Sequence, residues 1–407
     1  MEFRNLTPFS VMRYKMLNKA DHALHVVVMK AGFRLVKTSD GRCEAHILDQ
    51  QPLPLCIQDT YLGELNRSPV VQESDLAPFK PACDVIINAT GYAPAGKPCT
   101  AFPVNVRLST PAGESLLDKT LLLTGERQFV RQFTGEWLLS DPQLFTSLPV
   151  DYRFAFGGEG IVYPEDEGVA GRVEQKYRLN EAQRAAHPEQ EHLPVAHHVC
   201  VSNPHGCGYT EPWYLHATRK TALPAPRILS VSCSLQDTDF ESLAQGTADL
   251  RAPQYQPAGF GIIGRSWQSR LSKAGTYDPH WLETRHPYLP EDFDFGYWNG
   301  APQDQQIPFP TSAIRVELTN LTPDGHLSVT LPHHQALVLL RLENGKILPQ
   351  PMLMDTLLVD LDSMTISQTW RYVADTDMPL RVMETRYEVE PGALATNLFP
   401  YREKARG

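Results

Sequence analysis

The apolar positions of this chain fall into short runs that alternate with turns rich in glycine, proline, asparagine and aspartate. Runs over residues 25–36, 84–89 and 104–109 predict β-strands, because they combine β-branched residues with such boundaries. Gly32, inside the first run, predicts a β-bulge. Asp40–Gly41 predicts a hairpin whose return strand covers residues 43–48. Successive hairpins without a strand–helix–strand rhythm predict antiparallel sheets.

The same pattern continues along the chain and is interrupted once. Further strands are predicted over residues 119–123, 128–133, 145–158, 227–234, 314–321, 326–332, 335–342, 346–352, 356–362 and 364–373. Residues 159–200 are more polar, carry the one helical pattern (173–186), and are interpreted as an insertion. The expected fold is mainly β, with antiparallel, sandwich-like sheets, few short helices and long ordered loops. Because 407 residues exceed one typical core, we expect a large β-rich domain over residues 1–307 and a smaller one over 308–407.

One long stretch, residues 267–306, shows neither helical period nor strand alternation. It is rich in aromatic residues, which disordered segments lack. Long irregular connections in compact domains are usually functional when they are ordered. We therefore expect an ordered loop held by its own aromatic side chains. Replacing Trp281 or Tyr277 by alanine is predicted to cost about 3–5 kcal/mol if the ring is buried.

Composition narrows the classes of function. The net charge of −10 disfavours a nucleic-acid or anionic-membrane surface, and no apolar run is long enough to span a bilayer. The N-terminus lacks a secretory signal pattern. Seven scattered cysteines without a CxxC pair predict a reduced, cytoplasmic protein. Proline, at 34 residues, disfavours long helices.

Metal and nucleophile chemistry find little support in the sequence. A histidine and cysteine cluster comprises His197, His198, Cys200, His205 and Cys207. Its spacing matches no zinc motif and a second ligand pair is missing, so surface histidines and buried cysteines are the preferred interpretation. We predict no metal and no cofactor. No nucleophile elbow or phosphate-binding glycine loop is present, and no enzymatic activity is expected.

Asp292 and Asp294 are the one pair of carboxylates that suggests catalysis. Two carboxylates can divide acid and base roles in a glycosidase, with Trp281 and Trp298 as sugar platforms. A carbohydrate-active hydrolase is therefore the alternative function. The preferred interpretation is turn chemistry, in which each carboxylate accepts local backbone N–H bonds. Arg127, like Arg270, is interpreted either as a buried donor to loop carbonyls or acids or as a solvent-exposed side chain.

Many rare residues follow one another in the order of a known family. They include Asn5–Leu6–Thr7–Pro8–Phe9, Lys80–Pro81, Asp84–Val85, Gly91–Tyr92–Ala93–Pro94, Gly125–Glu126–Arg127, Ala155–Phe156–Gly157–Gly158 and Asn203–Pro204 with Gly206 and Gly208. The densest set lies in the long stretch: Trp267, Arg270, Gly275–Thr276–Tyr277–Asp278, Trp281, Pro290, Asp292–Phe293–Asp294, Tyr297, Asn299, Ala301–Pro302 and Gln305–Gln306. The chain resembles a domain-of-unknown-function family encoded in type VI secretion gene clusters, regarded as effector adaptors or chaperones.

This resemblance implies an accessory protein that stays in the cytoplasm. It would bind an effector, or that effector's PAAR-like spike-tip domain, and promote loading onto the VgrG spike. It implies that the quoted residues are partner-binding or define the fold. Whether the long stretch is also the contact surface is a separate question, and we expect its exposed edge, with the 91–94 and 203–208 loops, to make the contact. A structural component of the assembled spike is a further alternative. Gly32 replaces an expected threonine, and residues 159–200 match no part of the family pattern.

Overall fold

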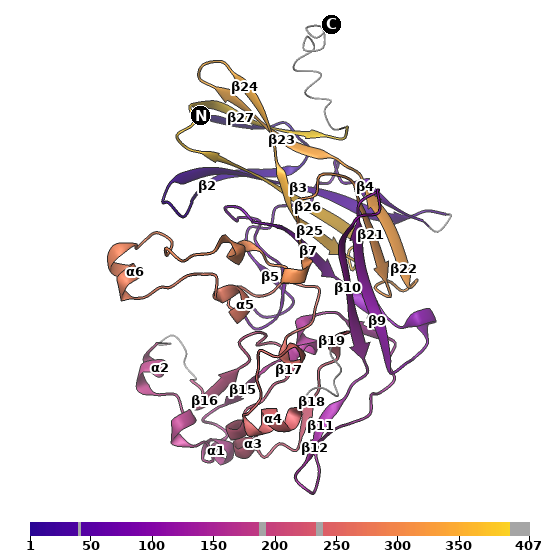
Figure 1. The fold of residues 1–407 in the computed structure, drawn as a ribbon, viewed down its shortest axis with the longest axis vertical. Coiled ribbons are helices and arrows are strands. Elements are labelled where there is room, and N and C mark those ends of the chain that lie inside the picture. Colours follow the sequence, from indigo (N-terminus) through magenta and orange to yellow (C-terminus); the bar gives the residue numbers. More distant parts are fainter. Residues whose placement is uncertain (40–41, 187–192, 233–238, 391–407) are drawn as a thin grey trace.

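The computed structural model describes residues 1–39, 42–186, 193–232 and 239–390. The predicted turn at Asp40–Gly41 and the residue Cys233 lie outside these ranges. The predicted mainly β fold is confirmed: most strand pairs are antiparallel, and the helices are short (Figure 1).

A seven-stranded sheet forms the centre of the molecule. Its order is β2 (Ser10–Leu17), β3 (Ala23–Lys37), β26 (Thr365–Asp375), β25 (Leu353–Asp360), β7 (Cys83–Asn88) and β20 (Gln306–Ile307), with β4 (Cys43–Ile47) also paired to β3. A five-stranded sheet contains β19 (Ile228–Ser230), β10 (Ser115–Thr124), β9 (Ala101–Ser109), β21 (Ile314–Thr319) and β22 (His326–Leu331). A four-stranded sheet contains β1 (Glu2–Asn5), β27 (Leu380–Glu388), β23 (Gln335–Leu342) and β24 (Ile347–Pro351).

These three sheets share one apolar core. It contains Val27 and Met29 of β3, Val104 of β9, Leu121 of β10 and Val338 of β23, all nearly inaccessible to solvent. Strands from both sides of residue 308, the predicted domain boundary, pair within each sheet. β25 lies parallel to β7, β21 lies antiparallel to β9, and β1 lies parallel to β27.

Smaller ladders and helices form the remainder, in the lower part of Figure 1 and along its side. The ladders join β11 (Gln128–Arg131) to β12 (Trp137–Leu139) and β18 (Ala222–Pro224), β13 (Ser147–Pro149) to β8 (Thr90–Tyr92), β14 (Phe156–Gly157) to β17 (Cys207–Gly208), β15 (Glu159–Val162) to β16 (Ala196–Val199), and β5 (Thr60–Tyr61) to β6 (Val70–Gln72). The helices are α1 (Glu167–Ala170), α2 (Glu181–Ala185), α3 (Pro212–Thr218), α4 (Phe240–Gln245), α5 (Gln268–Leu271) and α6 (Pro279–Thr284). Within the described ranges, no helix is long and apolar enough to cross a membrane.

Three local predictions were wrong. β3 pairs with β26 without a bulge at Gly32; instead, a Cβ there would lie 2.7 Å from the Leu53 side chain, so glycine makes room for that residue. The strand predicted over residues 145–158 is broken by a 3-10 turn, η2 (Tyr152–Phe154), which Asp151 caps through the Arg153 amide. The helix predicted over residues 173–186 is reduced to one 3-10 turn and α2, because the backbone of Leu179 bonds to Val195 instead.

Candidate functional site

One face of the seven-stranded sheet carries a row of polar residues in register. Lys30 of β3 lies opposite Thr369 of β26, which lies opposite Thr356 of β25, which lies opposite Asp84 of β7. Neighbouring positions on these strands point into the apolar core on the other face, because side chains alternate along a strand. Glu73, Asp75 and Lys80 lie over this polar face, since they enclose a small cavity together with residues of β3, β25 and β26.

Three buried ion pairs occupy this face. Lys30 Nζ lies 2.5 Å from Asp75, Lys80 Nζ lies 2.8 Å from Asp84, and Arg371 Nε lies 2.6 Å from Asp355. All three pairs are almost inaccessible to solvent. Burial opposes the charge on Lys80, but the carboxylates around it, with Asp84 foremost, raise its pKa. Each charge is therefore stable only with its partner in place.

Asp84 joins the sheet to residues 267–306, which we call the signature segment. Its carboxylate is fully buried and accepts hydrogen bonds from Asn299 Nδ2 at 3.0 Å, the Gly300 amide at 2.9 Å and the Ala301 amide at 3.2 Å. Lys80 Nζ is the fourth donor to this carboxylate. The predicted site residue Asn299 thus has a positioning role, because it fixes the end of the signature segment to β7.

Two more predicted site residues attach the signature segment. Gln305 is buried and donates to the carbonyls of Val85 and Phe260, at 2.8 Å and 2.9 Å. Arg270 is 4% exposed and bonds to Glu73 at 2.5 Å and to the carbonyls of Ile263 and Tyr297. Arg270 is therefore the buried donor that the sequence offered as one alternative. A buried guanidinium held by this many acceptors locks the segment in one geometry.

Between these attachments, residues 275–294 project from the molecule as an arm that ends in α6 (Figure 1). The base of the arm is closed by Asp292, which accepts from the amide and hydroxyl of Thr276 at 2.9 Å and 2.7 Å. Asp278 caps α6 through the Trp281 amide, and Asp294 caps the next turn through the Gly296 amide. The Asp294 bond is the local backbone bond that the sequence predicted, whereas Asp292 accepts from Thr276, sixteen positions away. The Thr276 bonds lower the pKa of Asp292.

The aromatic side chains of the arm are less buried than the sequence predicted. Tyr277 is 54% exposed, so the expected large cost of removing a buried ring does not apply to it. The rings of Tyr277 and His286 contact Trp281 edge-on, and Trp281 Nε1 donates to the Tyr288 carbonyl. At the base, Phe293 is buried against Tyr297. The aromatic side chains are therefore buried at the base of the arm, and some of those farther out, such as Tyr277 and Tyr288, remain exposed.

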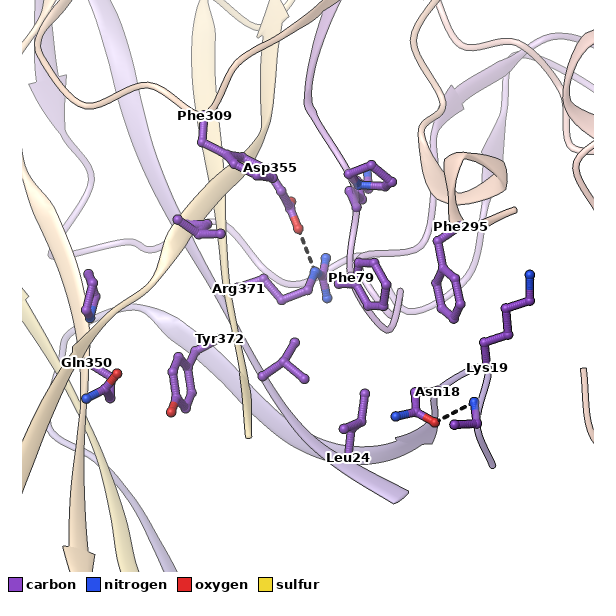
Figure 2. A pocket seen from close by; sticks show the side chains of 16 residues that line it. Asn18, Lys19, Leu24, Phe79, Phe295, Phe309, Gln350, Asp355, Arg371 and Tyr372 are labelled. Carbon is purple, nitrogen blue, oxygen red and sulfur yellow. Dashed lines mark hydrogen bonds and ion pairs between the residues drawn. The ribbon is translucent and has the colours of Figure 1, made fainter. Parts of the chain in front are cut away.

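A pocket of about 900 Å³ opens beside the base of the arm. Its walls come from the β2–β3 turn, residues 79–81, Phe295 of the signature segment, Phe309, and the strands β24, β25 and β26. Figure 2 shows Phe79 and Phe295 on one side and Tyr372 and Gln350 on the other. The first two rings are stacked at 4.3 Å between centroids. The Arg371–Asp355 pair faces this pocket. Tyr14 accepts a hydrogen bond from Arg371, and its pKa is raised to about 12, mainly because it is buried. The pocket combines apolar walls with charges that are already paired.

The other predicted site residues lie outside this pocket. Asn203 is buried and donates to the carbonyls of Tyr152 and Phe156, so the 203–208 loop packs against β14. Gly157 has φ 149°, and a Cβ there would lie 2.1 Å from the Asn203 carbonyl oxygen. The predicted residues in this region are Phe156, Gly157, Gly158, Asn203, Pro204 and Gly206. Those elsewhere are Tyr92 and Pro94, near β13, Arg127, which donates to the Ser140 carbonyl, and Gln306 in β20.

The histidine and cysteine cluster is dispersed in space. His197 bonds to Glu159, His205 contacts the Trp267 ring, and Cys207 bonds to a backbone carbonyl. His198 is packed among the rings of Tyr209, Trp213 and Tyr214, and burial there lowers its pKa to about 4. Among the residues described, no group of three or more potential ligands is placed to hold a metal.

Sequence reasoning missed the polar face of the central sheet. Lys30, Asp75, Asp355 and Arg371 were not proposed as site residues, although Lys30 and Asp84 stand within strongly apolar strands. A charged residue in such a strand is itself a signal, because it is rarely buried without a partner. Its partners come from distant positions, so the sequence alone could not pair them.

Comparisons with known proteins place the chain in a family. A family model described as an uncharacterized protein conserved in bacteria (DUF2169) matches residues 20–371. This range includes the polar face, the signature segment and most of the pocket wall. The searches of curated proteins and of solved structures gave no match.

Proposed function

This chain belongs to the DUF2169 family of bacterial proteins, and we propose that it is a non-catalytic accessory protein of type VI secretion. In the cytoplasm, it binds an effector or the effector's PAAR-like spike-tip domain and promotes loading onto the VgrG spike. The ordered set of motifs described above supports the link to secretion. The link to binding rests on the structure of the signature segment.

The observation that carries the proposal is the placement of the apolar pocket beside the projecting arm. Phe79, Phe295 and Tyr372 line a pocket of about 900 Å³, and the adjacent arm exposes further apolar side chains. Concave apolar sites with a few fixed polar groups are typical of binding sites. Exposed apolar surface on a folded protein is typical of protein–protein contacts. A spike-tip domain or effector that exposes apolar surface before assembly has a surface of the matching kind.

The polar residues of the signature segment favour binding over catalysis. Arg270 bonds to Glu73 and to backbone carbonyls, Asn299 and Gln305 bond to β7, and Asp292 and Asp294 bond to donors within the signature segment. Groups engaged in this way fix a shape that a partner can recognise. Type VI loading also requires release, so the complex should be tight but reversible when VgrG competes for the same surface.

The test is co-purification from the native host with the effector or PAAR-like protein encoded beside this gene. We expect a stable complex, and loss of effector secretion when the gene is deleted. Absence of a complex together with unchanged secretion would refute the proposal. Recovery of the chain with VgrG in the secreted fraction would favour a structural spike component instead. Glycan hydrolysis by the purified protein that is lost in Asp294→Asn would favour a hydrolase.

A further inference from the structure

The arm is strongly acidic. Residues 275–294 contain five carboxylates and a single arginine, Arg285, giving a formal charge of −4 with histidines neutral. All five carboxylates are exposed: Asp278, Glu283, Glu291, Asp292 and Asp294. Arg285 does not offset them at the surface, because it is paired with Asp21 at 2.7 Å. The arm therefore presents a net negative charge to a partner, and Lys19, which helps to lower the pKa of Asp292, offsets only part of it.

The same arm is apolar on its exposed side chains. Leu282 of α6 is 60% exposed, Tyr277 54% and Tyr288 41%. Charged and apolar side chains thus alternate over one short segment. A surface of this composition favours a partner that brings cations and bulky apolar groups together, because each kind of group finds its complement.

The arm and the pocket form one continuous surface. Arg285 bonds to Asp21 and to the carbonyl of Lys19, both in the β2–β3 turn. Lys19 and Ala20 of this turn line the pocket. Inside the pocket, Arg371 Nε is paired with Asp355, so the charge of Arg371 is compensated, although its buried Nη2 has no hydrogen-bond partner among the described residues. Among the residues that line the pocket, Lys19 is the one exposed cation.

Building on the proposed function, we infer that the occupant of this surface is a basic amphipathic segment of the partner. Its bulky apolar side chains enter the pocket lined by Phe79, Phe295 and Tyr372, and its lysines and arginines face the arm carboxylates. This is the usual way in which an amphipathic segment binds a groove, with apolar anchors on one face. The acidic arm accelerates encounter and selects against acidic segments, which suffer like-charge repulsion.

The probe is a fluorescently labelled amphipathic peptide of leucine and lysine with helical spacing, compared with a leucine and glutamate peptide of the same pattern. Binding to the full-length protein is followed by fluorescence anisotropy. The informative variant is Glu283→Lys with Glu291→Lys, since neither side chain is used in a cap. The matched control is Glu114→Lys with Glu136→Lys, two exposed acids away from the arm with the same change in net charge.

The lysine peptide should bind, and the glutamate peptide should bind at least about tenfold more weakly. The arm variant should lose about tenfold or more in affinity, and the control variant should keep wild-type affinity. Affinity should also fall as salt is raised, because the arm charges are exposed. Equal binding of both peptides, or equal loss in both variants, would overturn the inference. Arm-dependent dimers that exclude the peptide would also overturn it, since the occupant would be a second copy.

The same variants separate this inference from the proposed function. If the wild-type protein captures its genetic neighbour and the arm variant captures it equally well, the basic-segment inference fails and the adaptor role stands. If the wild-type protein captures no neighbour, the adaptor role fails, whatever the peptides do.

Discussion

Asp84→Asn tests whether the buried carboxylate on β7 holds the signature segment on the sheet. Asp84 is fully buried and accepts from Lys80 Nζ at 2.8 Å and from three donors of residues 299–301. The amide is nearly isosteric, but it removes the charge and turns one acceptor oxygen into a donor that faces other donors. Breaking a buried pair by changing one partner typically costs about 3–5 kcal/mol. We therefore expect a loss of about 3–5 kcal/mol in the free energy of unfolding.

Urea unfolding followed by tryptophan fluorescence measures this loss. Asp324→Asn is the matched control, because it breaks the exposed Lys37–Asp324 pair, and such pairs contribute about 0–1 kcal/mol. The double variant Asp84→Asn with Lys80→Met also removes the orphaned ammonium, so part of the loss should be recovered. A loss below about 1 kcal/mol in Asp84→Asn would contradict the claim that this carboxylate holds the signature segment on the sheet, because leaving its four donors without an acceptor should cost more than that.

The remaining predictions concern the packing around the site and the arm. Burial lowers the pKa of His198 to about 4 in the folded state, against an ordinary 6.5, so the unfolded state takes up the proton first as pH falls. The contribution of neutral His198 to the free energy of unfolding should be fully present above about pH 6.5 and fall by roughly 3 kcal/mol as pH drops to 4. In unfolding measurements, His198→Phe should remove this part of the pH dependence. Gly157→Ala should destabilise by about 3 kcal/mol or more, since φ is 149° and the Cβ would collide with the Asn203 backbone; thermal unfolding with wild-type stability would contradict it. Arg285→Ala should change global stability by less than about 1 kcal/mol, because its pair with Asp21 is partly exposed, but should speed proteolysis within the arm.

The β architecture was predictable because its signals are local. The strand predicted over residues 25–36 matches β3 to within two residues, and β21 to β26 were recognised from alternation and turn residues, whereas β27 was missed. The failures occurred where a distant contact decides the backbone. Asn203 shapes the chain at Gly157, and Val195 holds Leu179 in an extended conformation. Neither contact leaves a periodic trace in the sequence.

The candidate site was predictable only in part, for a similar reason. The signature segment was identified from its aromatic residues, and its ordered arm is present. The sequence could not divide its residues into anchors and surface. Arg270 is buried and paired with Glu73, nearly two hundred positions away in the sequence, whereas Tyr277 remains exposed. The pocket itself is assembled from six separate segments, so it has no signature in any one of them.

Capture of the genetically adjacent partner by a pocket variant tests the central claim most directly. Leu353 lines the pocket and is 49% exposed, so Leu353→Arg alters the pocket with little cost to the fold. Leu138→Arg changes an equally exposed leucine, at 51%, on β12. The account predicts that Leu353→Arg loses the partner, whereas Leu138→Arg and the wild-type protein retain it. Retention of the partner at wild-type affinity by folded Leu353→Arg would contradict the claim that this pocket is the contact surface.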